Sequence, residues 1–136
     1  MQWVMDEYHL SEIAIKNIRE MAKTDAAYII KSIKRLQMHR DVEKIVVVTH
    51  TVPDSSLIEH DISLAGRLKF NVMGNNLMQH ALAVDTENKI HTWCFGHYHG
   101  KIDQYRNGIR YVNNCRGRGD SEYKQWVYNP LRIEIN

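Results

Sequence analysis

An uninterrupted β-branched run, residues 45–48, constrains this sequence more than any other feature. It reads IVVV and is followed directly by Thr49 and His50. β-branched side chains favour extended backbone, and a run without polar residues is typical of a strand covered on both faces. We therefore expect an α/β fold in which this strand is buried and a loop begins after His50.

Two helices are expected before this strand. Apolar residues recur at helical spacing in residues 13–23, where Ser11 is a candidate N-terminal cap. They recur again in residues 26–39, where Thr24 or Asp25 would cap a second helix. The prediction for the N-terminal segment is therefore two consecutive helices.

Strands dominate the prediction for the rest of the chain. Expected in order are a loop from Thr51 to Phe70, a short helix over 75–84 capped by Asn75 or Asn76, a strand over 90–95, a hairpin over 101–114 that turns at Asn107-Gly108, and one or two closing strands over 126–135. This order predicts α/β with an antiparallel finish. Residues 1–136 are expected to form a single partial domain, with 1–40 helical and 41–136 carrying the sheet.

Composition excludes several classes of protein. The chain has 18 basic and 16 acidic residues, a net charge of +2, which does not indicate a nucleic-acid or membrane partner. No apolar stretch approaches the roughly 20 residues that span a membrane, and the first residues lack a signal-peptide pattern. Cys94 and Cys115 are too few for a disulfide framework. We therefore expect a cytoplasmic protein with reduced thiols.

Three histidines follow the two apolar strands. His50 comes after the first, and His97 and His99 come after the second, between Gly96 and Gly100. Neutral imidazole is a common ligand for divalent metals, and the glycines would let the backbone turn so that His97 and His99 point differently. These three residues are the candidate metal ligands. The alternative is an aromatic turn in which they make only structural contacts.

The motifs VVVTH and FGHYHG resemble the last two signature motifs of the calcineurin-like metallophosphoesterases. TVPDSS resembles the loop after the first motif, and the resemblance covers residues 24–135. It implies an α/β/β/α sandwich that hydrolyses phosphomonoesters or phosphodiesters. It also implies that His50 and His97 hold one divalent ion and His99 a second, the ions being manganese, iron or zinc.

The family's earlier motifs, Asp-x-His, Gly-Asp and Gly-Asn-His, do not precede His50. In the family they supply the bridging aspartate, an asparagine ligand and the histidine that protonates the leaving group. The resemblance therefore implies a C-terminal half that holds metal weakly and has little activity alone. Its completion would come from upstream sequence, a separate N-terminal half or a second copy, and we expect a homo-oligomer.

Two other functions stay open from the sequence. One is a non-catalytic oligomeric interaction module, or a truncated remnant of the same family. The other is nucleic-acid binding by residues 116–119, RGRG, with Tyr123 and Trp126 nearby. The second rests only on a short basic loop, so a nucleic-acid partner is not expected except as a substrate of the phosphoesterase.

Overall fold

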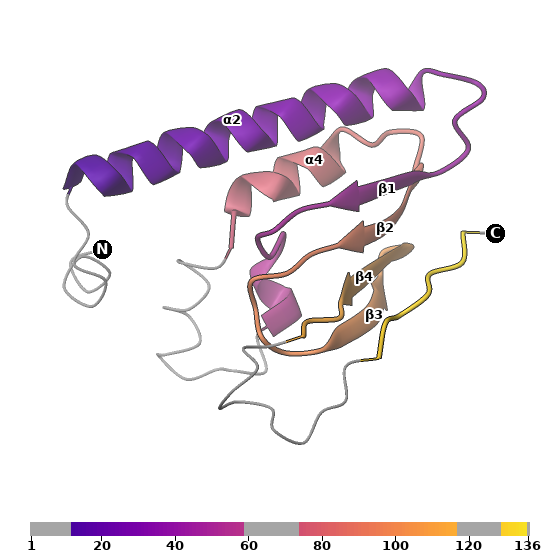
Figure 1. The fold of residues 1–136 in the computed structure, drawn as a ribbon. Coiled ribbons are helices and arrows are strands. Elements are labelled where there is room, and N and C mark those ends of the chain that lie inside the picture. The colour runs from indigo at the N-terminus through magenta and orange to yellow at the C-terminus, as the bar shows by residue number, and fades with distance from the viewer. Residues whose placement is uncertain (1–11, 59–73, 117–128, 136) are drawn as a thin grey trace.

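The computed structural model describes residues 12–58, 74–116 and 129–135 (Figure 1). Its elements in chain order are α2 (Glu12–Gln37), β1 (Ile45–Val48), the 3-10 helix η1 (Ser55–Ile58), the 3-10 helix η2 (Asn76–Met78), α4 (Gln79–Ala83), β2 (Ile90–Cys94), β3 (Ile102–Arg106) and β4 (Ile109–Asn113). Helix α2 contacts both α4 and β1. The expected α/β class is confirmed. No helix in these described ranges is long and apolar enough to cross a membrane.

The described strands form one mixed sheet in the order β1-β2-β4-β3. β1, β2 and β4 are parallel, and β3 is antiparallel to β4. The β3–β4 hairpin turns at Asn107 and Gly108, whose φ angles of 50° and 81° match the expected Asn-Gly turn. Because β1 and β2 are parallel, their carboxyl ends, where the histidine motifs begin, lie at the same edge of the sheet.

Helix α2 is continuous, so the prediction of two helices is wrong for residues 12–37. The expected break lies at Thr24, whose Oγ1 instead donates to the Glu20 carbonyl oxygen at 2.9 Å, one turn earlier in the same helix. No glycine or proline interrupts this stretch. The C-terminal half of α2, which holds its buried residues, packs against α4 and β1, and this packing favours an unbroken helix.

The prediction that β1 is covered on both faces is also wrong for the described chain. Ile45 and Val47 are buried, but the side chains of Val46 and Val48 are 39% and 72% exposed. Among the described strands, β1 pairs only with β2. The β-branched run thus correctly predicted a strand, while one of its faces and one of its edges lack a described neighbour.

The expected closing strands are not seen in residues 129–135, which form no helix or strand. Pro130 has no N–H to donate to a neighbouring strand. A hydrogen bond of 3.0 Å from Asn114 Nδ2 to the Asn129 carbonyl oxygen connects this segment to the residue after β4. Residues 126–128 lie outside the described ranges. The same is true of Gly117–Gly119, Tyr123 and Trp126, on which the nucleic-acid hypothesis depends.

A buried amide fastens the C-terminal end of α2 to the turn before β2. Gln37 Nε2 donates to the Val84 carbonyl oxygen at 2.7 Å, and its Oε1 accepts from the Glu87 N–H at 3.2 Å. The side chain is 7% exposed. This contact lies at the opposite end of β2 from the histidine motifs, so it stabilises the fold without touching them.

Candidate metal centre

The pairing of β1 and β2 continues beyond the ends of both strands. The Thr49 N–H donates to the Cys94 carbonyl oxygen at 3.0 Å, and the Gly96 N–H donates to the His50 carbonyl oxygen at 3.1 Å. These bonds carry the backbone of His50 alongside the residue that precedes His97. The parallel register therefore brings the two histidine motifs side by side.

The imidazoles of His50 and His97 are in direct contact. His97 Nδ1 lies 2.9 Å from His50 Nε2, and the rings meet edge to face with centroids 4.8 Å apart. One nitrogen donates a proton to the lone pair of the other, so the pair forms a hydrogen bond when at least one ring is neutral. His50 is exposed and His97 is half-buried, so solvent reaches this contact.

The distance between these nitrogens also fits two ligands of one metal ion. Ring nitrogens bind divalent ions at about 2.1 Å, which places two ligands about 3.4 Å apart in a tetrahedral shell, as zinc prefers, and about 3.0 Å apart at right angles, as in an octahedral shell. The observed 2.9 Å is close to the latter separation. The pair is incomplete by itself, because no three His, Cys, Asp or Glu side chains within the described residues come together as a metal-binding group.

The backbone at His97 is strained. The Tyr98 N–H donates to the Gly96 carbonyl oxygen at 2.7 Å, which closes a three-residue turn around His97, and His97 has a φ of 62°. A turn of this hand is rare for residues other than glycine and costs on the order of 1–3 kcal/mol. Such strain persists only where surrounding contacts hold it, and it concentrates at functional sites.

The third candidate ligand, His99, lies in the same loop but does not join His50 and His97 in a cluster of three. It is half-buried. The carbonyl oxygens before and after it, of Tyr98 and Gly100, both accept hydrogen bonds from Asn113 Nδ2, at 2.6 Å and 3.0 Å. The backbone on both sides of His99 is therefore fastened to Asn113, at the end of β4.

Gly100 is required by the ring of Tyr98. A Cβ at Gly100 would overlap the Tyr98 Cε1 atom, so a larger residue there would displace the aromatic ring. At Gly96 the constraint is weaker, since a Cβ would lie 3.6 Å from His50 Nδ1, an ordinary contact distance. The two glycines expected to shape the loop thus act differently.

A second polar contact supports the turn that carries His50. Trp93 Nε1 donates to Thr49 Oγ1 at 3.0 Å, and Thr49 Oγ1 donates to the Thr51 carbonyl oxygen at 2.8 Å. Trp93 is fully buried. Both hydrogen bonds of the Thr49 hydroxyl are therefore made within the chain.

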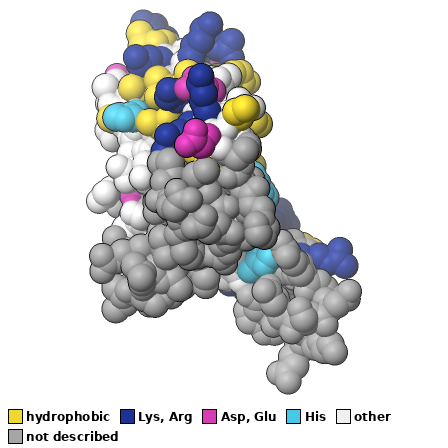
Figure 2. Space-filling model, turned by 90° about the vertical axis from the view of Figure 1, so that its left-hand side faces the viewer, with side chains coloured by type: hydrophobic (Ala, Val, Ile, Leu, Met, Phe, Trp, Pro, Cys, Tyr) yellow, Lys and Arg dark blue, Asp and Glu magenta, His cyan; other side chains and the backbone are white. Residues whose placement is uncertain are grey.

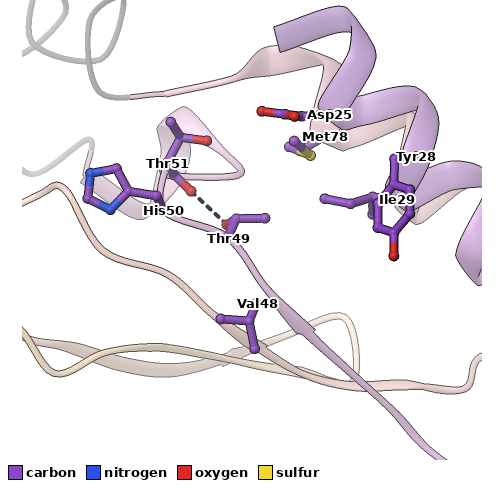
Figure 3. Close-up of a pocket in the computed structure, with 8 residues that line it drawn as sticks. All are labelled: Asp25, Tyr28, Ile29, Val48, Thr49, His50, Thr51 and Met78. Atoms are coloured by element: carbon purple, nitrogen blue, oxygen red, sulfur yellow. Dashed lines mark hydrogen bonds between the residues drawn. The ribbon is translucent and has the colours of Figure 1, made fainter. Parts of the chain in front are cut away.

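A cavity of about 280 Å³ lies between helix α2 and the turn that carries His50 (Figure 3). Asp25, Tyr28 and Ile29 of α2 form one wall, and Val48 and Thr49 form the facing wall. The imidazole of His50 points away from the cavity in this view. The cavity thus borders the turn that carries His50, while the contact between the histidines lies outside it.

Cys94 does not add a negative ligand to the site. Burial raises the pKa of its thiol above the ordinary value, only partly opposed by the charge of Arg110. The thiol is therefore protonated at neutral pH and behaves as a small half-buried side chain. Within the described residues, no Asp, Glu or Cys side chain joins the two histidines in a group of three that could hold a metal ion.

Two residues that shape the site were missed by the sequence analysis, Asn113 and Trp93. Both act through contacts with residues that are distant in sequence, and neither belongs to a motif. The only local signal for Asn113 is its place at the end of a predicted hairpin strand.

Comparison of this chain with models of known protein families, with characterised proteins and with solved structures found no match.

Proposed function

We propose that this chain is the C-terminal part of a dinuclear metal-dependent phosphoesterase that hydrolyses phosphomonoesters or phosphodiesters. The observation that carries the proposal is the approach of His97 Nδ1 to His50 Nε2 at 2.9 Å, at the ends of neighbouring parallel strands. The motifs VVVTH and FGHYHG resemble those of the calcineurin-like metallophosphoesterases, and by that resemblance these histidines share one ion and His99 holds the other.

The donor set fits divalent ions of intermediate hardness. Imidazole nitrogen suits zinc, iron and manganese, and the separation of the paired nitrogens is close to that of two ligands at right angles on one ion. When bound, such ions supply a Lewis acid that activates water and stabilises the charge of the phosphate. The task of this chain is to present neutral imidazoles at fixed positions, which the parallel strands and the strained turn at His97 both favour.

Carboxylates complete the centre in this proposal. Two dications a few ångströms apart repel unless a negative ligand lies between them, and no described Asp or Glu joins the histidines in a metal-binding group of three. Upstream sequence, a separate N-terminal half or a second copy would supply the bridging carboxylate. We therefore propose that the isolated chain has weak metal affinity and little hydrolytic activity.

The complete enzyme would be an α/β/β/α sandwich, of which the described sheet is a part. The support is the surface that the described residues leave exposed along β1. Val46 and Val48 are exposed on one face of the strand, and its outer edge has no partner among the described strands. Such an apolar edge is normally covered in a stable protein, and here the missing strands and helices would cover it.

Zn²⁺ titration by calorimetry tests this function. The variants are His97→Ala and, as a matched control, His80→Ala, which removes an exposed histidine on α4. We expect wild type and the control to bind alike, and His97→Ala to bind at least tenfold more weakly because the ion loses one of two ligands. Equal binding by all three proteins, or no binding by wild type, would overturn the proposal.

An oligomeric interaction module is the second candidate, and a specific observation favours it. Helix α2 exposes Ile13, Ile18, Met21 and Tyr28, each more than half accessible, and hydrophobic side chains lie among Lys and Arg side chains on this part of the surface (Figure 2). In that function the hydrogen bond between His50 and His97 has a structural role, joining the segments that follow β1 and β2. Unchanged oligomeric state and stability in His97→Ala, together with no metal binding by wild type, would support it.

A further inference from the structure

We propose that Asn113 is the positioning residue of the candidate metal centre, a role that rests on the proposed function. Its side-chain amide holds the backbone on both sides of His99 and thereby fixes where the imidazoles of His97 and His99 lie. It acts through the loop that carries them.

The loop that carries His97 and His99 begins and ends beside the C-terminal end of β4, where Asn113 lies. It departs after Phe95, whose N–H donates to the Val112 carbonyl oxygen at 2.9 Å, and it returns at Ile102, which pairs with Asn113 itself. Asn113 is the last residue of β4, which lies between β2 and β3 in the sheet. The loop therefore closes over the end of the strand that holds this amide.

Both N–H groups of the Asn113 amide are used. Nδ2 donates to the Tyr98 carbonyl oxygen at 2.6 Å and to the Gly100 carbonyl oxygen at 3.0 Å. The side chain is 2% exposed, so water does not readily compete for these donors. An amide on a central strand has few rotatable bonds, and groups fastened to such an element are held more precisely than groups on a free loop.

These bonds complement the strained turn at His97. On one side, the Gly96 N–H bond to the His50 carbonyl oxygen fixes the entry to the turn. On the other side, the Asn113 bond to the Tyr98 carbonyl oxygen fixes its exit. A positive φ at a histidine persists only when both flanks are restrained, so loss of the second restraint should let the His97 ring move away from His50.

Gln37 offers a matched control, because it is a buried amide with the same kind of contacts at a remote place. It fastens the turn after α4 through bonds to the Val84 carbonyl oxygen and the Glu87 N–H. Removal of either amide should lower stability. Only removal of Asn113 should alter the histidines.

The experiment compares Asn113→Leu, which keeps the size but removes both donors, with Gln37→Met. The imidazole nitrogen signals are recorded by NMR without metal, and Co²⁺ alone is then titrated by absorption spectroscopy. We expect Asn113→Leu to shift or broaden the His97 and His99 signals and to lower the Co²⁺ affinity by about tenfold or more. Gln37→Met should lower the melting temperature and leave the signals and the affinity unchanged.

Unchanged histidine signals in Asn113→Leu, or equal changes in Gln37→Met, would overturn the proposal. If Asn113→Leu does not fold, Asn113→Ser, which keeps one donor, takes its place in the same comparison. Wild type gives an independent check, since both side-chain amide protons of Asn113 should resist exchange with solvent, and rapid exchange would contradict the role.

Failure of the proposed function is distinguishable from failure of this inference. If wild type binds no Co²⁺ but the metal-free histidine signals respond to Asn113→Leu and not to Gln37→Met, the phosphoesterase proposal fails and the loop-positioning role stands. If wild type binds Co²⁺ and Asn113→Leu binds it equally well with unaltered signals, the metal site stands and the role of Asn113 is wrong.

Discussion

The indole N–H of Trp93, near the end of β2, donates to the hydroxyl of Thr49, the residue after the parallel strand β1, at 3.0 Å. The hydroxyl in turn donates a hydrogen bond to the Thr51 carbonyl oxygen at 2.8 Å. His50 lies between Thr49 and Thr51 in the chain. The turn that presents His50 is thus fastened to a fully buried side chain.

Thr49→Val should lower the free energy of unfolding by about 1–3 kcal/mol. The valine has nearly the shape of threonine but leaves the buried indole N–H of Trp93 without its acceptor, and an unsatisfied buried donor costs about that amount. Urea denaturation measures the change. Thr49→Ser keeps the hydroxyl and should lose less, and equal losses in the two variants would contradict the importance of this bond.

His97→Gly should be more stable than His97→Ala by about 1 kcal/mol. Both variants remove the bond to His50, but only glycine adopts a positive φ without steric cost. The φ of 62° at His97 therefore predicts that glycine is the more stable of the two residues here, whereas alanine is the more stable in a helix or strand. Thermal unfolding of the two variants measures it. An alanine variant as stable as the glycine variant would show that the turn relaxes when the imidazole is absent.

Asp103→Asn should reduce the loss of stability at acid pH. The hydrogen bond from Arg110 is the main cause that lowers the pKa of the Asp103 carboxyl, with Arg110 Nε and Nη2 at 2.8 Å and 2.7 Å. Because the pKa is lowered, the stabilisation from this ion pair is fully present above the pKa of Asp103 in the unfolded chain, about 3.9. It is lost as the pH falls through the lower pKa of Asp103 in the folded protein.

Urea denaturation at pH 6 and pH 3 measures this loss. Wild type should lose more stability than Asp103→Asn between the two conditions. The difference should be small, since the Asp103 side chain is 43% exposed and solvent screens the pair. Equal losses would show that the ion pair does not persist in solution.

Val48→Asp should weaken self-association of the chain. We expect wild type to form a dimer or larger oligomer at micromolar concentration, because Val48 is 72% exposed at the unpartnered edge of β1. Burial of a carboxylate against an apolar surface is unfavourable, so the association constant should fall about tenfold or more. Light scattering measures it. Leu131→Asp, a change at a residue that is 43% exposed elsewhere on the chain, is the control. A monomeric wild type would contradict this prediction.

Local patterns in the sequence were sufficient to predict much of this fold. β1 and β2 follow from their apolar runs, and the β3–β4 turn follows from Asn107-Gly108, because these preferences act between neighbouring residues. The continuity of α2 was not predictable in this way, since Thr24 serves equally well as a cap and inside a helix. Packing of distant segments decides between the two.

The candidate site shows the same division. The place of His50 and His97 at strand ends could be predicted from residue type and order. The approach of their rings depends on the register of β1 with β2, where Val48 lies beside Cys94. The role of Asn113 depends on a loop that folds back over its strand, and no pattern around residue 113 encodes that contact.

The register of β1 with β2 also limits how such a chain can vary. His50 stands two residues beyond Val48, and His97 stands three residues beyond Cys94, the partner of Val48. Each residue along a strand advances the chain by about 3.3 Å and reverses its facing side. A single insertion within either short offset would therefore separate the two rings, whereas a change of length in the long connection between the strands need not move them. Related sequences should be sought by these two fixed offsets, with the distance between the motifs left free.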